Sequence, residues 1–303
     1  MRAVDLFAGA GGFTTGAKAA GAQVVWAANH WPAAVAIHAA NHPTTVHACQ
    51  DLQQADWYSV PRHDLVLASP ACQGHALARG RERPHHDAAR STAWAVVSAL
   101  EAGRAPVAIV ENVPEFRRWT LYPAWLEALR LLGYTAAEHI IDAADLGVPQ
   151  RRVRLFIVLT RSAHPLRLVV PSRPRGQALD IINFDAGRWD PVVRPGRAAA
   201  TLARYEAGRR EHGRRFLLPY YGTARGGRSL KEPIGTITTS ANHHAVVDGD
   251  KMRMLLASEV QAAMGFPESY HLPERRTLAV HLLGNAVCPP VAQALVEAVE
   301  EQA

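Results

Sequence analysis

The sequence has few cysteines and no long apolar run. Its 303 residues include only three cysteines, Cys49, Cys72 and Cys288. An odd number of widely spaced cysteines argues against a disulfide framework and predicts a reducing compartment, the cytoplasm. No apolar run approaches the roughly 18 residues of a spanning helix, and the N-terminal residues read as a strand, so we expect neither a membrane partner nor a signal peptide.

Lysine is also scarce, so nearly all positive charge is arginine. Lys18, Lys231 and Lys251 are the only lysines, whereas lysine and arginine together number 33 and the net charge is +6. Arginine contacts phosphate and guanine edges with two hydrogen bonds at once, which favours a nucleic-acid partner. A GC-rich genome would also favour arginine over lysine, and composition does not separate the two causes.

Strands and helices alternate over the first half of the chain. We predict strands at 2–7, 22–28, 64–68, 106–110, 134–141 and 150–159. The predicted helices cover 13–20, 33–40, 91–103 with Ser91 as N-cap, and 123–132. This alternation is typical of an α/β fold with a doubly wound, mostly parallel Rossmann-like sheet.

The pattern changes after Thr160. Residues 161–228 are rich in arginine, glycine and proline and lack sustained periodicity, which predicts a smaller, irregular domain. A decorated insertion or a disordered linker is the alternative, and the scattered aromatic residues argue against full disorder. A last helix is predicted over 291–300.

The polar residues at three strand ends suggest an active site. Cys72 follows a buried strand and a Pro70 turn, Glu111 follows another strand, and Arg152 and Arg154 lie in a third segment. A sheet would gather them on one rim. A thiolate needs electropositive neighbours, and a desolvated carboxyl favours its protonated form. The set suits nucleophilic attack on an electron-poor ring, although a lone cysteine is more often a small buried residue.

A glycine turn follows the first predicted strand. Gly9, Gly11 and Gly12 lie between that strand and a helix, where the backbone can approach a ligand. A plain turn is the alternative reading, because a glycine turn alone is weak evidence.

Five motifs together resemble those of bacterial and phage DNA cytosine-5 methyltransferases. They occur in the family's order and span nearly the whole chain: Asp5-Leu-Phe-Ala-Gly-Ala-Gly-Gly-Phe13, Pro70-Ala-Cys-Gln73, Glu111-Asn-Val113, Gln150-Arg-Arg-Val-Arg154 and Gly284-Asn-Ala-Val287. The resemblance implies an S-adenosylmethionine-dependent methyltransferase sheet with a target-recognition domain. The implied boundaries are 1–160 plus 284–303 for the catalytic domain and 161–283 for the small one.

By the same resemblance, Cys72 attacks C6 of a flipped-out cytosine and Glu111 contacts its N3 side. Arg154 holds the cytosine O2 and Arg152 supports the site. The residues that would contact DNA are Gln73, Arg79, Arg81 and Arg83. The residues that would bind S-adenosylmethionine are Phe7, Gly9, Gly11, Gly12, His30, Trp31, Asp51 and Asn285.

The chain departs from the family pattern at several positions. His30 stands where an acidic residue is usual, which leads to the hypothesis of weaker cofactor binding or of a modified cofactor. Ala71 replaces a proline, and His75-Ala76 replaces an aromatic-serine pair. Cys288 is interpreted as structural. His243 and His244 are interpreted as polar loop residues, and we expect no metal site.

The expected partner is double-stranded DNA, with a cognate restriction endonuclease as a further candidate and a monomer in the cytoplasm, associated with the nucleoid, as the working state. Two alternatives stay open. One is an RNA cytosine-5 methyltransferase that modifies tRNA, and the other is a catalytically silent relative that binds a specific DNA site.

Overall fold

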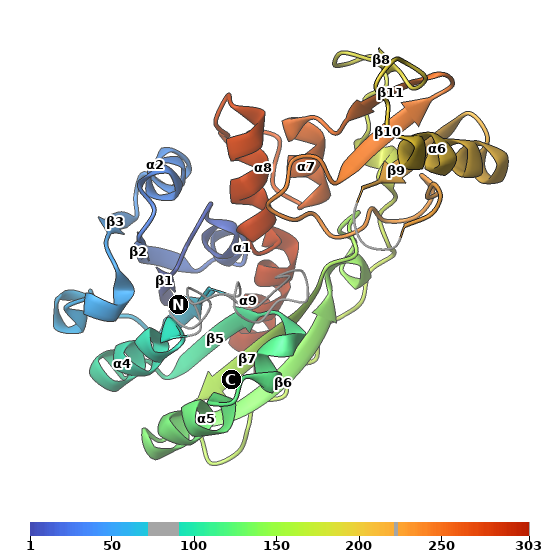
Figure 1. The fold of residues 1–303 in the computed structure, drawn as a ribbon. Coiled ribbons are helices and arrows are strands. Elements are labelled where there is room, and N and C mark those ends of the chain that lie inside the picture. The colour runs from blue at the N-terminus through green and yellow to red at the C-terminus, as the bar shows by residue number, and fades with distance from the viewer. Residues whose placement is uncertain (72–90, 221–223, 303) are drawn as a thin grey trace. The chain divides into compact units, whose positions relative to one another are not determined.

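The computed structural model describes residues 1–71, 91–220 and 224–302. The chain folds into two compact units. The large unit comprises Met1–Asp142, Val153–Pro171 and Ala286–Ala303, and the small unit comprises Ala143–Arg152 and Ser172–Asn285. Each unit is described by itself (Figure 1).

The large unit is built on a seven-stranded sheet of order β3-β2-β1-β4-β5-β7-β6. The strands are β1 (Arg2–Leu6), β2 (Gln23–Asn29), β3 (Val46–Cys49), β4 (Leu65–Ala68), β5 (Val107–Asn112), β6 (Thr135–Asp142) and β7 (Val153–Thr160). Five neighbouring strands are parallel, and β7 runs antiparallel to both β5 and β6. The predicted α/β fold with a mostly parallel sheet is confirmed.

Hydrophobic burial explains why the central strands form. All four residues of β4 and all six of β5 are buried, as expected for strands covered on both faces. The helices that cover the sheet are α1 (Gly12–Ala19), α2 (Pro32–Asn41), α4 (Trp94–Gly103), α5 (Tyr122–Leu131) and α9 (Pro289–Gln302). Short 3₁₀ helices are η1 (Leu52–Gln54), η2 (Trp57–Ser59) and η4 (Pro114–Arg118).

Helix α1 packs directly on α9 because a glycine lies where the two helices meet. A Cβ atom on Gly16 would lie 2.3 Å from the Pro289 carbonyl oxygen and 2.5 Å from Ala292 Cβ. Helix α9 at the carboxyl end of the chain therefore packs in the same layer as α1 near its amino end.

The Ser91 N-cap prediction was wrong: α4 begins at Trp94 after Ala93, without a side-chain cap.

The small unit contains a four-stranded antiparallel sheet of order β8-β11-β10-β9. The strands are β8 (Asp190–Pro191), β9 (Arg215–Pro219), β10 (His244–Asp248) and β11 (Lys251–Met254). The helices are η5 (Ala143–Asp145), η6 (Ala178–Ile181), α6 (Ala199–His212), α7 (Ala257–Ala263) and α8 (Arg276–Asn285). The expectation of an irregular segment without periodicity was wrong for residues 199–212, which form α6 beside β9 (Figure 1).

Within the described residues, one segment is long and apolar enough to cross a membrane by length and composition alone, Arg276–Gln302. Its most apolar window is 78% buried in the fold, which is typical of core helices in folded proteins. The segment is also divided into α8 and α9.

Candidate active site

The residues before Cys72 are held from two sides. Asn112 at the end of β5 donates from Nδ2 to the Pro70 carbonyl oxygen at 3.2 Å, and Ala71 N donates to Thr92 Oγ1 at 3.1 Å. Because β4 and β5 are parallel neighbours, this turn lies at the same rim as the end of β5. Cys72 is the next residue, and it lies outside the described residues together with Gln73, Arg79, Arg81 and Arg83.

Glu111 and Arg154 form an ion pair at this rim. Arg154 Nε lies 3.1 Å from Glu111 Oε1, and the arginine and glutamate side chains are 16% and 10% exposed. The antiparallel pairing of β5 with β7 brings them together, since Asn112 is opposite Leu155. Arg154 also donates from Nη1 to its neighbour's carbonyl oxygen, on Val153, at 2.8 Å. Two residues that the sequence predicts to share a rim are thus in contact.

Arg152 belongs to the small unit, where its guanidinium joins two segments. Nη1 donates to the Ile237 carbonyl oxygen and Nη2 to the Gly284 carbonyl oxygen, both at 3.0 Å. The predicted strand at 150–159 begins only at Val153. Gln150 is fully buried and accepts from Ile237 N at 2.7 Å. Residues 150–152 therefore brace the small unit instead of extending β7.

The glycine turn has a left-handed backbone at several positions. Phe7, Gly9 and Gly11 have φ values of 60°, 54° and 76°. Only glycine adopts such angles without strain, so Phe7 is held there by its surroundings. One such restraint is the bond from Ala8 N to the Ala28 carbonyl oxygen, at 3.0 Å. The turn lies at the carboxyl end of β1, where open α/β sheets bind ligands.

The next two strands place three more predicted cofactor residues at the same edge. His30 and Trp31 follow β2, and Trp31 N donates to Asn29 Oδ1 at 2.9 Å. Asp51 follows β3, and its side chain caps η1 by accepting from Gln53 N at 3.0 Å. The His30 and Asp51 side chains are exposed, and Trp31 is partly exposed. Asn285 ends α8 in the small unit and is exposed.

These residues fit S-adenosylmethionine. A partly exposed indole can stack on an adenine, an exposed carboxylate can accept from an exocyclic amino group, and Gly9 in the turn after β1 leaves backbone uncovered by a side chain. The large unit thus offers an aromatic face, an acceptor and a glycine-containing turn after the adjacent strands β2, β3 and β1. No described residue calls for a modified cofactor.

Sequence reasoning missed a buried polar group behind the glycine turn. Asp5 is fully buried on β1, and its Oδ2 accepts from Thr14 N at 3.1 Å and from Thr14 Oγ1 at 2.7 Å. Burial raises the pKa of Asp5 to about 7, against the lowering effect of the two Thr14 hydrogen bonds. An aspartate inside an apolar strand was the available signal.

Of the adjacent histidines His243 and His244, the second is in a strand and not in a loop. His244 is in β10 and 6% exposed, which corrects the prediction, and burial lowers its pKa to about 4. His243 Nδ1 lies 2.7 Å from Thr238 Oγ1. Within residues 1–71, 91–220 and 224–302, no group of three or more His, Cys, Asp or Glu residues is placed to hold a metal ion. Cys288 is buried, and Cys49 is exposed.

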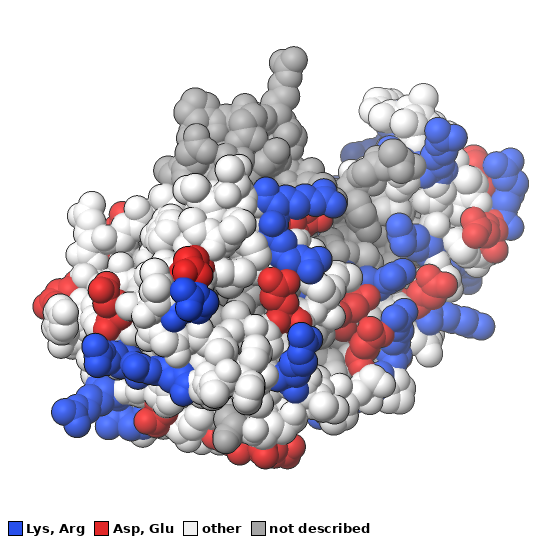
Figure 2. All heavy atoms as spheres, turned by 90° about the horizontal axis from the view of Figure 1, so that it is seen from below, with Lys and Arg blue, Asp and Glu red and all other residues white. Residues whose placement is uncertain are grey.

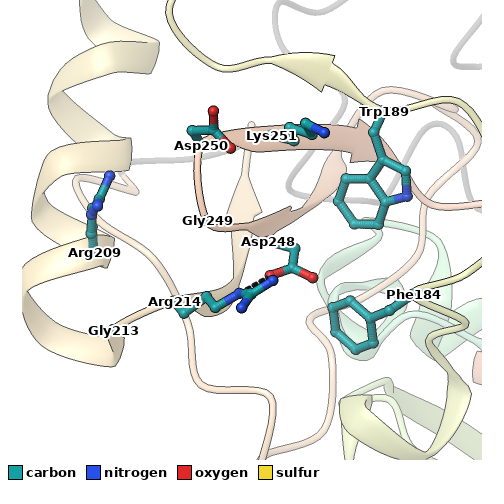
Figure 3. Close-up of a pocket in the computed structure, with 9 residues that line it drawn as sticks. All are labelled: Phe184, Trp189, Arg209, Gly213, Arg214, Asp248, Gly249, Asp250 and Lys251. Carbon is teal, nitrogen blue, oxygen red and sulfur yellow. Dashed lines mark hydrogen bonds and ion pairs between the residues drawn. The ribbon is translucent and has the colours of Figure 1, made fainter.

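A hollow of about 740 Å³ lies in the small unit, beside the β10–β11 turn (Figure 3). Phe184 and Trp189 form its aromatic side, with ring planes 12° apart and centroids 6.3 Å apart. Charged side chains surround the rest, and Arg214 Nε donates to Asp248 Oδ1 at 2.6 Å. The guanidinium carbon of Arg215 lies 4.0 Å from the Phe184 ring centroid. The lining residues are Phe184, Trp189, Arg209, Gly213, Arg214, Asp248, Gly249, Asp250 and Lys251.

The excess of arginine is partly balanced by acidic residues. On the face shown in Figure 2, basic and acidic side chains are interspersed. Exposed ion pairs in the described part of the chain include Arg130 with Glu127 and Arg175 with Asp145.

Comparison with known proteins identifies the class. The model of the C-5 cytosine-specific DNA methylase family matches residues 1–185 and 194–301. The type II methyltransferase M.MspI of Moraxella sp. is 25% identical, covering 97% of this chain and 69% of its own length. M.NlaX of Neisseria lactamica is 26% identical, covering 98% and 95%. The chain belongs to the C-5 cytosine-specific DNA methylase family, and it is an S-adenosylmethionine-dependent enzyme of that family.

Solved structures agree in fold. A DNA modification methyltransferase encoded within a prophage of E. coli has a TM-score of 0.71 and 16% identity, with 100% of this chain and 99% of that chain covered. A DNMT2 variant from Spodoptera frugiperda has a TM-score of 0.72 and 19% identity, with 99% of each chain covered. At these identities the likeness supports the seven-stranded α/β architecture.

Proposed function

We propose that the protein methylates C5 of a flipped-out cytosine within a specific sequence of double-stranded DNA. The observation that carries the proposal is the Glu111–Arg154 pair at the rim where the β4 turn leads into Cys72. A carboxyl and a guanidinium that are close together and mostly buried can hold the N3 and O2 edge of one pyrimidine ring. The same edge carries the residue types that nucleophilic addition needs.

In the proposed reaction, the Cys72 thiolate adds to C6, and a bond forms between Sγ and C6 while the ring electrons move toward C5. Glu111 donates a hydrogen bond to N3 in its protonated form and Arg154 donates to O2, so the negative charge that develops on the ring is stabilised. S-adenosylmethionine, when bound, supplies the methyl group. Loss of the C5 proton then restores the double bond and breaks the bond between Sγ and C6, which frees Cys72.

Arg152 acts at a distance in this proposal. Its two bonds to the Ile237 and Gly284 carbonyl oxygens stabilise the chain immediately before Val153 and Arg154. It is therefore a positioning residue, and the chemistry on the cytosine is assigned to Cys72, Glu111 and Arg154. The DNA contacts are assigned to Gln73, Arg79, Arg81 and Arg83.

For the cofactor, we assign the turn at Phe7, Gly9, Gly11 and Gly12, with His30, Trp31, Asp51 and Asn285. A neutral imidazole at position 30 hydrogen-bonds a ribose hydroxyl without the strength of a charged acceptor. S-adenosylmethionine binding is thus weaker than with a carboxylate there. Equilibrium titration of His30→Glu tests this, and equal or weaker binding by that variant would count against it.

The proposed setting is a monomer that acts on DNA in the cytoplasm, in association with the nucleoid. Two of the similar proteins are named type II methyltransferases, which supports a role beside a cognate restriction endonuclease. Specificity is assigned to the small unit, whose arginine and aromatic side chains surround the hollow in Figure 3.

The test is transfer of radiolabelled methyl groups to unmethylated duplex DNA and, in parallel, to unmodified tRNA. We expect label in DNA at C5 of cytosine within one sequence. Label in tRNA alone would indicate that the substrate is RNA and not DNA. Specific DNA binding without transfer to either substrate would indicate a silent DNA-binding relative.

A further inference from the structure

A chain of hydrogen bonds runs from the buried carboxyl of Asp5 to β3. Thr14 Oγ1 lies 2.7 Å from Asp5 Oδ2 and 3.0 Å from His38 Nε2. The other nitrogen of His38, Nδ1, lies 2.8 Å from His47 Nε2. Asp5, Thr14 and His38 are buried and His47 is partly exposed, so the chain connects a closed carboxyl to a histidine that solvent reaches.

We propose that Asp5 is a proton-linked positioning residue for the cofactor turn, and that Thr14, His38 and His47 carry its proton to and from solvent. The proposal rests on the assignment of the Phe7–Gly12 turn to S-adenosylmethionine. It concerns the residues that lie behind that turn and hold it in place.

Donor counting along the chain supports the proposal. When Asp5 is ionised, the Thr14 hydroxyl donates to Oδ2, so His38 must donate from Nε2 and accept at Nδ1 from His47. When Asp5 is protonated, the order reverses: Asp5 donates to Thr14, Thr14 to His38, and His38 Nδ1 to His47 Nε2. The two arrangements use the same atoms. When the hydrogen bonds change direction, one proton enters or leaves at His47.

The carboxyl itself has one well-placed site for that proton. Asp5 Oδ1 is buried, and no hydrogen-bond partner lies beside it in the described part of the chain. A proton on Oδ2 instead faces Thr14 Oγ1. Burial raises the pKa of Asp5 to about 7, so both arrangements are populated near neutral pH.

The surroundings of His38 and His47 favour the neutral form of each imidazole. Burial is the main cause that lowers the pKa of His38 to about 2, and the neighbouring charges of His42, His47 and Lys18 lower it further. Burial also lowers the pKa of His47, while the Thr45 backbone raises it. A neutral imidazole accepts at one nitrogen and donates at the other, as proton transfer along the chain requires.

The ionised form restrains the cofactor turn more strongly. Asp5 Oδ2 accepts from Thr14 N in the first turn of α1, two residues after Gly12. A carboxylate makes both bonds to Thr14 as a charged acceptor, whereas a protonated Oδ2 must donate to the hydroxyl. Cofactor binding should therefore favour ionised Asp5. At a pH near 7, the pKa of Asp5, binding should release a proton.

The test is calorimetric titration of S-adenosylmethionine into the full chain without DNA, in buffers of different ionisation enthalpy. The wild type should release about half a proton per cofactor at pH 7, and its affinity should fall about tenfold per pH unit below that. Asp5→Asn should bind with no proton release. His47→Leu removes the hydrogen-bond partner of His38 Nδ1 in both arrangements, so the inflection of its pH dependence should shift from that of the wild type.

His139→Gln is the matched control, because His139 is also a histidine with a pKa lowered by burial but lies on β6, at the opposite end of the sheet. It should behave as the wild type. Unfolding curves at pH 5.5 establish that each variant is folded. Binding with no proton release in the wild type, or equal shifts in His47→Leu and His139→Gln, would overturn the inference. Absence of S-adenosylmethionine binding in the wild type would instead contradict the cofactor assignment.

Discussion

Arg154 on β7 and Glu111 on β5 form an ion pair with 3.1 Å between Nε and Oε1, and their side chains are only 16% and 10% exposed. Neither residue is near the other in sequence. The antiparallel pairing of β7 with β5 brings them together, which places a carboxyl and a guanidinium beside the turn that precedes Cys72.

Removing one partner of this pair should lower both stability and activity. Arg154→Ala leaves a mostly buried carboxylate without this guanidinium, so we expect the free energy of unfolding to fall by about 3 kcal/mol. Methyl transfer should fall at least about a hundredfold. Arg130→Ala, which removes a solvent-screened pair with Glu127, should change stability little and leave activity unchanged. Equal effects in urea unfolding and transfer assays would contradict the prediction.

The interface between α1 and α9 should tolerate no side chain at Gly16. A Cβ there would lie 2.3 Å from the Pro289 carbonyl oxygen, which requires the helices to separate. We expect Gly16→Ala to lower the free energy of unfolding by about 1–3 kcal/mol, as overpacking typically does. Gly226→Ala is the control, since among the described residues its Cβ would meet Ala207 Cβ alone, at 3.6 Å. Thermal unfolding of both variants measures the difference, and similar melting temperatures would refute it.

Acid should destabilise the small unit through His244. Burial lowers the pKa of His244 to about 4 from an ordinary 6.5, so between these values the unfolded chain binds a proton that the folded one does not. This contribution to stability is complete above pH 6.5 and is lost as the pH falls toward 4. In urea titrations at several pH values, His244→Gln should reduce the slope by about 1.4 kcal/mol per pH unit in this range. Val247→Ala, in the same strand, should lower stability equally at all pH values. An unchanged slope for His244→Gln would be inconsistent with this account.

A phosphate contact in the hollow of the small unit should appear in the salt dependence of DNA binding. Lys251 is exposed on its rim beside the β10–β11 turn. Lys251→Ala should reduce the slope of log K against log salt concentration by about 0.9 for one lost phosphate contact. Arg130→Ala removes the same unit of charge from the large unit and should leave the slope unchanged. Fluorescence anisotropy at four salt concentrations separates the two outcomes.

The sequence was sufficient to predict the α/β class and the rim shared by Glu111 and Arg154. Buried strands such as β4 and β5 are continuous apolar runs, and polar residues at their ends are easily noticed. The family membership expected from the five motifs is confirmed by the family model. The roles of individual residues stay predictions.

Other features were beyond sequence reasoning. Helix α6 was missed because its buried face consists of Thr201, Tyr205 and Gly208, which give almost no apolar periodicity. His244 was read as a loop residue because nothing local reveals that β10 is an inner strand. The hydrogen-bond chain from Asp5 to His47 joins four separate elements, β1, α1, α2 and β3, and no spacing rule connects residues that only tertiary packing brings together.

The central claim is that Cys72 is the nucleophile and a DNA cytosine its target. The most direct measurement is trapping with S-adenosylmethionine and duplex DNA that carries 5-fluorocytosine, because fluorine at C5 cannot leave as the proton does. The account predicts a denaturation-resistant adduct with the wild type and with Cys49→Ala, whose cysteine is exposed, but none with Cys72→Ala. An adduct formed equally by Cys72→Ala, or none formed by a wild-type protein that binds both DNA and cofactor, would contradict it.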